Sequence, residues 1–422
     1  MAIKVPRGDH WLTNCEFDLV PAGAVFSARA ERSTPEDPHL TPSQQYGVIT
    51  QQQYMEITGN RVVLNLTGAD NMKHVEPGDY IIHLRSFQGG IELSRIAGKV
   101  SNAYTVLTPR TELNEDYFRY LLKCDSFIDG LASMTDQLRD GQNISYAKFS
   151  QLKLPLPDLA TQRAIADYLD RETRQIDAMA AKLDGLTERL EERRAAVIPT
   201  ATTGQLRSRP EQDWATNKWL GKFPAEWNEQ RIGALVVRSK VPNTGMLESN
   251  LLSLSYGRIK RKDINTDEGL LPASFETYQI VDPGCEVFRF TDLQNDQKSL
   301  RSGLVTERGI ITSAYVATSP RLTHIVPRYF DYSMRSLDLA KAFYQMGAGV
   351  RQTVKFEDLA QVKIPLPSMD EQRRIADYLD KQTAKIDAMI VKAAQLKELL
   401  AERRSALITA TVIGNNDAYK EA

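Results

Sequence analysis

Residues 151–179 read QLKLPLPDLATQRAIADYLDRETRQIDAM, and residues 361–389 read QVKIPLPSMDEQRRIADYLDKQTAKIDAM. The two stretches align without a gap at an offset of 210 residues, and about 28 of the 64 residues in 141–204 are identical to their counterparts. Self-similarity at one fixed offset identifies a tandem repeat. The chain is therefore predicted to hold two copies of one architectural unit.

The shared part of each copy is predicted to be a long helix. Its apolar residues recur at alternating spacings of four and three, with gaps only at Glu172, Arg193, Gln382 and Arg403. A sustained period of 3.5 residues is typical of a coiled-coil seam. The predicted helix–helix interface consists of Ile165, Leu169, Ile176, Met179, Leu183, Leu186, Leu190, Val197, Ile375, Leu379, Ile386, Met389, Ala393, Leu396, Leu400 and Leu407.

The ends of these helices carry ordinary start and stop signals. Asp158 or Asp370 supplies a carboxylate near the first turn, and Gly204 or Gly414 can end the helix. About 38 residues at 1.5 Å each give a rod of roughly 57 Å. Because the ends of a compact domain usually lie close together, the second helix is expected to run back along the first. We expect an antiparallel coiled coil with one variable domain at each end, related by a pseudo-two-fold axis.

Outside the helices the two copies diverge, although short pieces such as VEPGDY (75–80) and VDPGCE (281–286) still correspond. Fixed pieces within dissimilar sequence favour two domains that recognise different things, while simple drift of a duplicated scaffold stays as the alternative. The predicted segments are a first variable domain 1–157, a helical spacer 158–204, a second variable domain 205–367, a second helical spacer 368–414 and a tail 415–422.

Each variable domain is predicted to mix strands and helices, so the fold class is α+β. β-Branched content and alternation indicate the strands, and an amphipathic pattern indicates a helix near the end of each domain. The first domain offers strands at 61–66, 79–84 and 90–100 and a helix at 115–133. The second offers strands at 250–259, 285–290 and 309–319 and a helix at 329–346.

Charge is unevenly distributed along a nearly neutral chain. The net charge of the 422 residues is −1, but it is −3 over residues 1–157 (15 Lys and Arg against 18 Asp and Glu) and +4 over residues 205–367 (22 against 18). Contacts with DNA phosphates usually need a basic face. If this chain binds DNA, we therefore expect partner subunits to supply much of the grip.

Other features of the composition indicate a soluble protein of the cytoplasm. The sequence has no apolar run long enough to span a membrane and no apolar signal core at its start. The three cysteines, Cys15, Cys124 and Cys285, are far apart, which fits reduced thiols better than disulfides or a zinc site.

Candidate DNA-reading residues are basic and amide side chains in expected loops. Arg and Lys can pair with guanine edges and Gln or Asn with adenine, while any of them can instead hold phosphate. For a single exposed arginine, a solvated surface charge is the simpler interpretation. The candidates are Arg85, Ser86, Gln88, Gln142, Asn143, Arg258, Lys260, Arg261, Lys262, Lys298, Arg301, Arg351 and Gln352.

Catalytic motifs are missing from the sequence. It contains no Asn-Pro-Pro-aromatic or Asp-Pro-Pro-aromatic tetrapeptide, no GxxxxGK[ST] phosphate loop and no cluster at metal-ligand spacing. The five histidines are scattered, and each is interpreted as a surface or satisfied core residue. We predict a binding subunit without catalytic residues, cofactor or metal of its own.

Taken together, the motifs resemble those of the specificity subunit of type I restriction-modification enzymes. The resemblance rests on PLP followed by QxxIADYLD (162–170 and 372–380), on TxxIDAM, on ERRxAxI, and on WLGKFPAEW (219–227), and it covers nearly the whole chain. The start of the chain departs from the pattern, because GDHW (8–11) stands where the fuller WLGxxPxxW motif is expected.

The resemblance implies a division of labour. Two target-recognition domains would each read one half of a split, asymmetric site in double-stranded DNA, and the helices would fix the gap between the halves. Two methyltransferase subunits and restriction subunits would bind to this chain and bring S-adenosylmethionine, ATP and Mg²⁺ chemistry. The rival functions are a protein–protein scaffold with two ligand-binding domains and, less well supported, a stand-alone enzyme.

Overall fold

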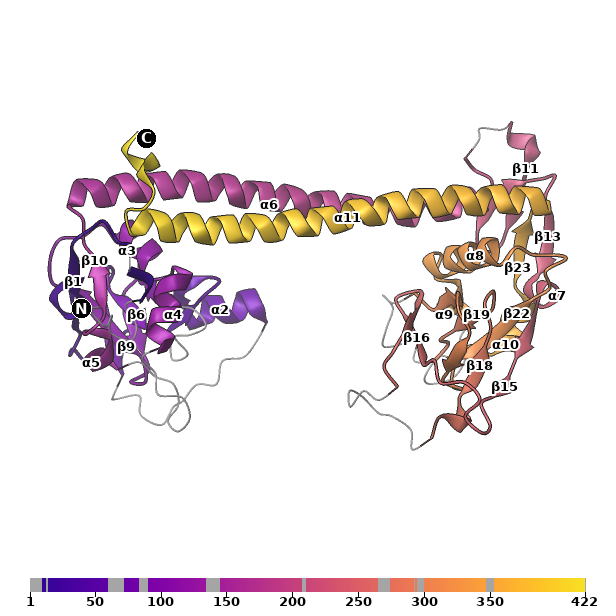
Figure 1. Ribbon diagram of the computed structural model, residues 1–422, viewed down its shortest axis with the longest axis horizontal. Helices are drawn as coiled ribbons and strands as arrows, with labels where there is room; N and C mark the ends of the chain where they lie inside the picture. Colours follow the sequence, from indigo (N-terminus) through magenta and orange to yellow (C-terminus); the bar gives the residue numbers. More distant parts are fainter. Residues whose placement is uncertain are drawn as a thin grey trace, which may run out of the picture. The chain divides into compact units, whose positions relative to one another are not determined.

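The computed structural model describes residues 10–12, 14–59, 72–82, 90–133, 145–206, 210–264, 274–291, 293, 300–346 and 353–421. The chain folds into two compact units, each with its own core. Unit 1 is Met1–Leu183 with Ala394–Ala422, and unit 2 is Asp184–Ala393. Two long helices, α6 (Leu159–Thr202) and α11 (Met369–Val412), each contribute one part to either unit (Figure 1).

Besides its parts of the long helices, unit 1 contains short strands and helices that precede α6 in the sequence, and one short helix at the C-terminus. These are η1 (His10–Leu12), β1 (Leu19–Pro21), α1 (Ala22–Val25), β2 (Phe26–Ala28), β3 (Leu40–Ser43), β4 (Gly47–Thr50), α2 (Gln51–Thr58), β5 (Lys73–Val75), β6 (Tyr80–Ile82), β7 (Ile91–Leu93), β8 (Gly98–Val100), β9 (Thr105–Pro109), α3 (Glu115–Leu121), α4 (Asp125–Ser133), α5 (Tyr146–Phe149), β10 (Lys153–Pro155) and the C-terminal η6 (Asp417–Lys420).

Unit 2 contains a similar series in front of α11. These are η4 (Glu211–Asp213), β11 (Trp214–Asn217), β12 (Gly221–Pro224), β13 (Asn228–Arg231), α7 (Ile232–Leu235), β14 (Val236–Ser239), β15 (Val241–Pro242), β16 (Leu252–Ser255), β17 (Arg258–Arg261), η5 (Phe275–Thr277), β18 (Gln279–Val281), β19 (Glu286–Phe288), β20 (Ser302–Leu304), β21 (Gly309–Ile311), β22 (Val316–Pro320), α8 (Pro327–Leu339), α9 (Ala342–Met346), α10 (Phe356–Gln361) and β23 (Lys363–Leu366).

The sheets of the two units have the same antiparallel topology. Unit 1 has the order β2-β9-β6-β7, and unit 2 has β14-β22-β19-β20. β1 pairs with β10 and β13 pairs with β23, so in each unit the strand just before a short helix, α1 or α7, pairs with the strand that precedes the long helix. Leu19 faces Pro155 in unit 1 and Glu229 faces Pro365 in unit 2, again at an offset of 210 residues. The tandem repeat read from the sequence therefore holds for the folded domains.

Several predicted elements are divided by turns. The strand expected at 90–100 is two strands, β7 and β8, and the strand expected at 250–259 is the first part of a hairpin, β16–β17, that turns at Tyr256 and Gly257. The helix expected at 329–346 ends at Leu339, because Lys341 has a φ of 57°. Periodicity could not show the turn of the β16–β17 hairpin, since alternation continues through a two-residue hairpin turn. The strand expected at 61–66 lies outside the described residues.

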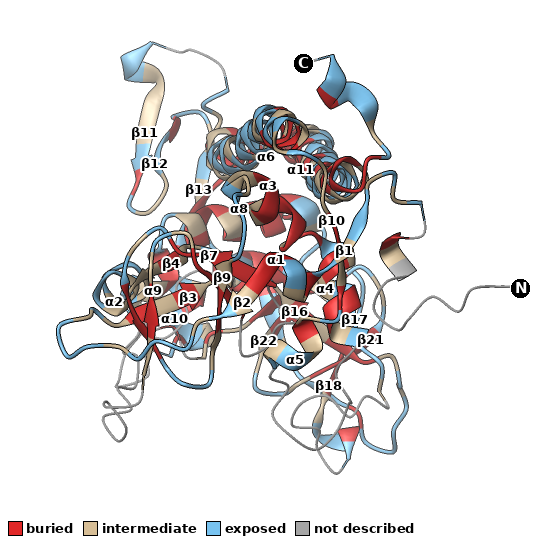
Figure 2. Cartoon of the chain, turned by 90° about the vertical axis from the view of Figure 1, so that its left-hand side faces the viewer, coloured by how far each residue is buried: buried red, intermediate tan, exposed pale blue. Residues whose placement is uncertain are grey.

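The two long helices pair in an antiparallel manner within each unit. In unit 1, Ile165 and Leu169 near the start of α6 share one hydrophobic cluster with Ile408 and Val412 near the end of α11. In unit 2, Ile375 and Leu379 near the start of α11 share a cluster with Ile198 and Ala201 near the end of α6. Seen in unit 1, the buried residues lie in the sheet, in α3 and where the long helices meet it (Figure 2). The predicted fold, with two mixed domains and paired antiparallel helices, is confirmed.

The seam is only partly the one predicted. Of the predicted interface residues, Ile165, Leu169, Ile176, Leu190, Ile375, Leu379, Ile386, Ala393 and Leu400 are buried, whereas Leu183, Val197 and Leu407 are half-buried. Met179, Leu186, Met389 and Leu396 are 42–52 % exposed, so the prediction was wrong for these four side chains. The predicted residues that recur every seven positions, from Leu169 to Val197 and from Leu379 to Leu407, stay buried or half-buried, so one stripe of the seam is kept and the stripe between is half-exposed. In the last turns, Ile198 and Ile408 are buried beside the half-buried Val197 and Leu407.

A buried tyrosine hydroxyl ties the strand before one long helix to the last turn of the other. Tyr117 of α3 lies with its hydroxyl 3.2 Å from the carbonyl oxygen of Pro155 and 3.0 Å from that of Val412. Tyr329 of α8 repeats the arrangement with Pro365 at 2.8 Å and Thr202 at 3.2 Å. Both tyrosine side chains are fully buried, and burial raises the pKa of each hydroxyl, which therefore stays a donor.

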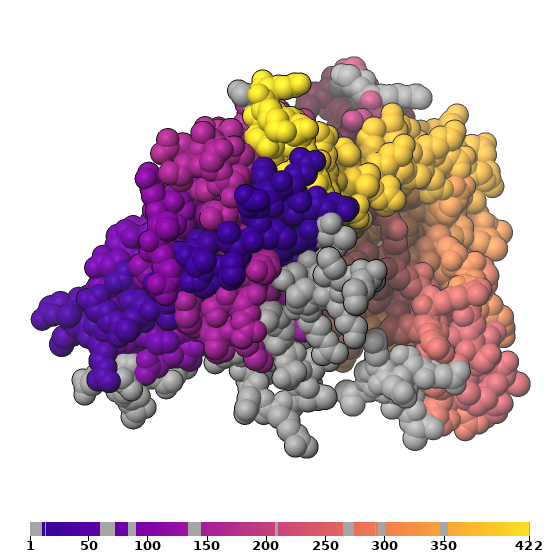
Figure 3. Space-filling model, turned by 60° about the vertical axis from the view of Figure 1, so that its left-hand side comes forward, coloured from indigo at the N-terminus to yellow at the C-terminus, as the bar shows by residue number. Residues whose placement is uncertain are grey.

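The C-terminal residues complete unit 1. The backbone N–H of Glu16 donates to the carbonyl of Ile413 at 2.9 Å, and Tyr419 of η6 is buried in the same cluster as Leu169. Figure 3 shows the indigo N-terminal residues against the yellow C-terminal end of the chain. No helix in the described part of the chain is long and apolar enough to cross a membrane.

Tyr329→Phe is predicted to destabilise the chain by about 1–3 kcal/mol, because it leaves the carbonyls of Pro365 and Thr202 buried without this donor. Denaturant unfolding of the full chain measures the change. Tyr378→Phe is the matched control, since that ring is half-buried beside the same cluster. Equal stability of Tyr329→Phe and the wild type would contradict the role given to the hydroxyl.

Candidate nucleic-acid interface

Each unit carries one β-hairpin in an equivalent place. β3 and β4 pair from Leu40 with Thr50 to Ser43 with Gly47, and β16 and β17 pair from Leu252 with Arg261 to Ser255 with Arg258. The hairpins differ in their turns. Three residues, 44–46, turn the first, and two residues, 256–257, turn the second.

A glycine lets the base of each hairpin lie directly on the neighbouring strand. A Cβ on Gly98 of β8 would lie 2.6 Å from the carbonyl oxygen of Pro38, and one on Gly309 of β21 would lie 2.5 Å from that of Asn250. The next residue in each strand donates its N–H to the same carbonyl, in both cases at 2.9 Å. Both hairpins are thus docked on the neighbouring strand by equivalent backbone contacts.

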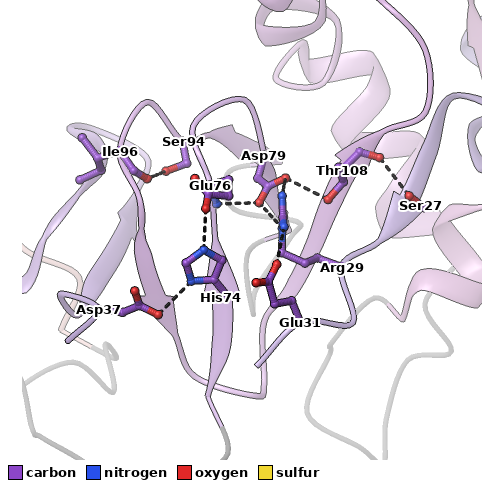
Figure 4. Close-up of polar contacts among 10 residues, drawn as sticks. All are labelled: Ser27, Arg29, Glu31, Asp37, His74, Glu76, Asp79, Ser94, Ile96 and Thr108. Carbon is purple, nitrogen blue, oxygen red and sulfur yellow. Dashed lines mark hydrogen bonds and ion pairs between the residues drawn. The ribbon is translucent and has the colours of Figure 1, made fainter. Parts of the chain in front are cut away.

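In unit 1, a polar network holds the segment that leads into the hairpin (Figure 4). His74 of β5 lies with Nδ1 2.9 Å from Asp37 and with Nε2 2.8 Å from Glu76. The bond with Glu76, followed by the bond with Asp37, raises the pKa of His74 despite its burial. The buried Lys99 ammonium donates to the carbonyls of Thr34 and Pro35 at 3.2 and 3.1 Å. His74 and Lys99 therefore fix the segment just before β3.

The outer part of the first hairpin borders a cavity of about 520 Å³. Gln44 and Gln45 are exposed at its turn, and α3, β7 and the end of α11 form the other walls. The cations in these walls are already paired, as Arg404 with Asp177 at 3.2 Å and Lys123 with Glu92 at 2.7 Å. The cavity therefore offers amide groups rather than uncompensated positive charge.

The second hairpin is bound to its surroundings by arginines. Arg258 forms an ion pair with Asp387 of α11, which also pairs with Arg194 of α6 at 3.2 Å. Arg335 of α8 donates to the carbonyl of Gly257 at 2.9 Å and pairs with Asp331 at 3.1 Å. These contacts hold the turn against both long helices and α8.

A buried carboxyl group lies beneath this hairpin. Glu286 of β19 is 1 % exposed, and neither of its carboxyl oxygens has a hydrogen-bond partner among the described residues. Burial, followed by repulsion from Asp331, raises the pKa of Glu286 well above its usual range. Arg335 pairs with Asp331 and donates to the carbonyl of Gly257, so it links this buried group to the turn of the hairpin.

The described candidate DNA-reading residues have three different environments. Lys260 and Lys262 are exposed, whereas Arg258 and Arg261 are exposed but engaged in ion pairs with Asp387 and Glu307. Arg301 is fully buried: its backbone N–H donates to Asp338, and its guanidinium lies against Tyr344. As placed, Arg301 cannot reach DNA, so its assignment as a reading residue is corrected to a core residue.

The remaining candidates cannot be placed in this way. Outside the described residues lie Arg85, Ser86, Gln88, Gln142, Asn143, Lys298, Arg351 and Gln352. Sequence reasoning also missed Gln44, Gln45 and Tyr256, which the structure puts at the hairpin turns. The signal that could have found them is Tyr-Gly between two alternating stretches, which is a weak form of the Asn-Gly hairpin pattern. Among the described residues, no group of three His, Cys, Asp or Glu side chains could hold a metal ion.

Comparison with known proteins shows to which family this chain belongs. A family model described as the type I restriction modification DNA specificity domain matches residues 16–188 and 315–398, more than half of the chain. The chain belongs to the type I restriction-modification DNA specificity family. The resemblance seen in the PLP, QxxIADYLD and TxxIDAM motifs is thereby confirmed.

The relatives of this specificity protein are distant in sequence. It is 26 % identical to the EcoBI specificity subunit of Escherichia coli over 263 residues, which are 59 % of this chain and 55 % of that subunit. It is 27 % identical to the StySPI specificity subunit of Salmonella potsdam over 133 residues, 32 % of this chain and 27 % of that one. The match thus spans about half or less of the length of these curated relatives.

Two solved structures share the fold of this specificity protein. One comes from a study of complex assembly and conformational transition of the type I R-M system, with a TM-score of 0.65 and 15 % identity over 94 % of this chain and 97 % of the other. The other is the HsdS subunit of Thermoanaerobacter tengcongensis, with a TM-score of 0.55 and 16 % identity over 98 % and 99 % of the two chains. At these identities the likeness establishes the fold.

The His74 network predicts that stability falls as the pH rises. The pKa of His74 is raised above the value near 6.5 of an unfolded chain, so its contribution is full below about pH 6.5 and is lost as the pH rises through the folded pKa. The free energy of unfolding of the wild type, measured with urea, should decrease as the pH rises above about 6.5, and His74→Gln should remove most of that decrease. His324→Gln changes an exposed histidine and is the control, in which the decrease of stability with pH should stay as in the wild type. An unchanged decline in His74→Gln would contradict the network.

Proposed function

We propose that this chain is the DNA sequence-specificity subunit of a type I restriction-modification complex. Each target-recognition domain reads one half of a bipartite, asymmetric site in double-stranded DNA. Membership of the specificity family and two domains with a common scaffold but unlike exposed hairpins support this function. The observation that carries it is the pairing of identical docking glycines, Gly98 and Gly309, with different turns.

The long helices are proposed to act as the spacer between the half-sites. Rigid paired helices can hold two DNA-binding domains about one turn of DNA apart, roughly 34 Å, which makes the gap a property of the protein. The half-exposed apolar side chains along the helices, such as Met179 and Met389, would then be available to methyltransferase subunits. A relative structure is named for complex assembly, which is consistent with such partners.

The chemistry of the complex is assigned to those partners. Adenine methylation requires a base to be turned out of the stack into a catalytic pocket, and restriction requires ATP-driven subunits. We propose that this cytoplasmic chain contributes neither catalytic residues nor S-adenosylmethionine, ATP or Mg²⁺ sites, and that it selects which adenines reach the methyltransferase. The curated relatives are likewise named as specificity subunits.

Long-read methylation mapping of the host with and without the gene tests this function. A split motif with adenine methylation in both halves should be present in the wild type, vanish on deletion and return when the gene is restored. Because the unlike hairpins imply unlike half-sites, the motif should be asymmetric. An unchanged methylome after deletion would reject the specificity function and favour the scaffold that displays two ligand-binding domains.

A further inference from the structure

The turn of the second hairpin carries a residue that the fold does not favour. Tyr256 has a φ of 47° and Gly257 a φ of 75°, so both central residues are left-handed, as in a type I′ turn. Asn-Gly is the favoured pair there, and a bulky side chain in the left-handed region costs strain. The Tyr256 side chain is nevertheless 75 % exposed. A strained, water-exposed aromatic ring points to a functional constraint.

Basic residues follow the turn along β17 and just beyond it. Side chains alternate along a strand, so Arg258 and Lys260 of β17 lie on the opposite side from Ile259, which packs against a hydrophobic cluster, and Lys262 directly follows the strand. Arg261 shares the inner direction and pairs with Glu307. Lys260 and Lys262 are exposed, and neither forms an ion pair within the described ranges. Two unneutralised cations thus lie close behind the aromatic tip.

Contacts with α8 and α11 hold the turn of the second hairpin, Tyr256 and Gly257, in place. The carbonyl of Gly257 accepts a hydrogen bond from Arg335, and Arg258 is paired with Asp387. A Cβ on Gly257 would lie 2.8 Å from Leu300, so the turn also packs closely on its inner side. The hairpin is therefore a rigid ribbon whose outer end is aromatic and basic.

Resting on the proposed function, we propose that the β16–β17 hairpin enters the major groove of the DNA half-site read by unit 2. The major groove is wide enough for a two-stranded ribbon. Tyr256 contacts the bases or sugars at the tip, and Lys260 and Lys262 bind flanking phosphates. Arg258 is a positioning residue that fixes the ribbon against α11 and contacts no base.

Tyr256→Asn separates folding from recognition. Asn-Gly suits this turn better than Tyr-Gly, so the melting temperature of the variant should be equal to or above that of the wild type. Affinity for a duplex that carries the methylated motif should fall about tenfold, a loss typical of one aromatic contact with a base. Binding is measured by fluorescence anisotropy on the chain assembled with its methyltransferase partners, against a duplex of scrambled sequence.

Two further variants sharpen the test. Met246→Asn relieves the same kind of strain at a φ of 54°, in a segment, 243–250, without lysine or arginine, and should leave DNA affinity unchanged. Combined Lys260→Ala and Lys262→Ala should lower the slope of log affinity against log salt by about two, because two phosphate contacts are lost.

The outcomes are distinguishable. Unchanged affinity of Tyr256→Asn, or a loss that appears only with a lower melting temperature, overturns the tip contact while leaving the proposed function intact. An equal loss in Met246→Asn overturns it as well, because strain relief alone would then explain the effect. If the wild-type assembly binds both duplexes equally, the proposed function fails, and the tip contact fails with it.

Discussion

The hydrogen bonds of two buried tyrosines set the architecture. The hydroxyl of Tyr117 or Tyr329 can reach both of its carbonyl partners only if the start of one long helix and the end of the other meet over the same domain. Around each hydroxyl, the first turns of one helix and the last turns of the other share a single apolar cluster. Neither domain core is complete without the helix that belongs to the other repeat, so the antiparallel pairing is required by the domains as well as by the seam.

On this common scaffold, the two domains carry hairpins at equivalent positions, β3–β4 and β16–β17, that expose different side chains. Their hairpins are docked through Gly98 and Gly309 with equivalent backbone bonds, and a Tyr-Gly pair stands at both turns. In the first hairpin two exposed glutamines precede a half-buried Tyr46, whereas in the second the exposed Tyr256 is followed by basic residues. The supporting contacts differ as well, because carboxylates around His74 fix the first hairpin and arginines fix the second. The buried backbone contacts that position each hairpin are thus repeated in both domains. The exposed residues at the hairpin turns, where recognition would take place, differ.

Sequence reasoning was strongest for features with a period and weakest for features made by distant residues. The repeat, both helices and their direction could be predicted, because offset and spacing are properties of the sequence itself. The exposure of Met179 and Met389 could not, because the spacing is the same for both stripes of the predicted seam and does not show which stripe is covered. The burial of Arg301 could not be predicted either, because its contacts with Tyr344 and Asp338 come from chain segments about 40 residues away. The incomplete motif at the N-terminus has a related cause, as residues 413–421 supply part of the packing there.

The central claim, that each domain reads its own half-site from an equivalent frame, is tested most directly by making the two domains identical. Residues 229–365 can be replaced by residues 19–155, because both segments begin and end on the same paired positions of β1–β10 and β13–β23. Methylation mapping of a host that carries only this chain should reveal an inverted repeat of one former half-site, separated by the original gap. Retention of the original asymmetric motif, or methylation of an unrelated sequence, would contradict the account.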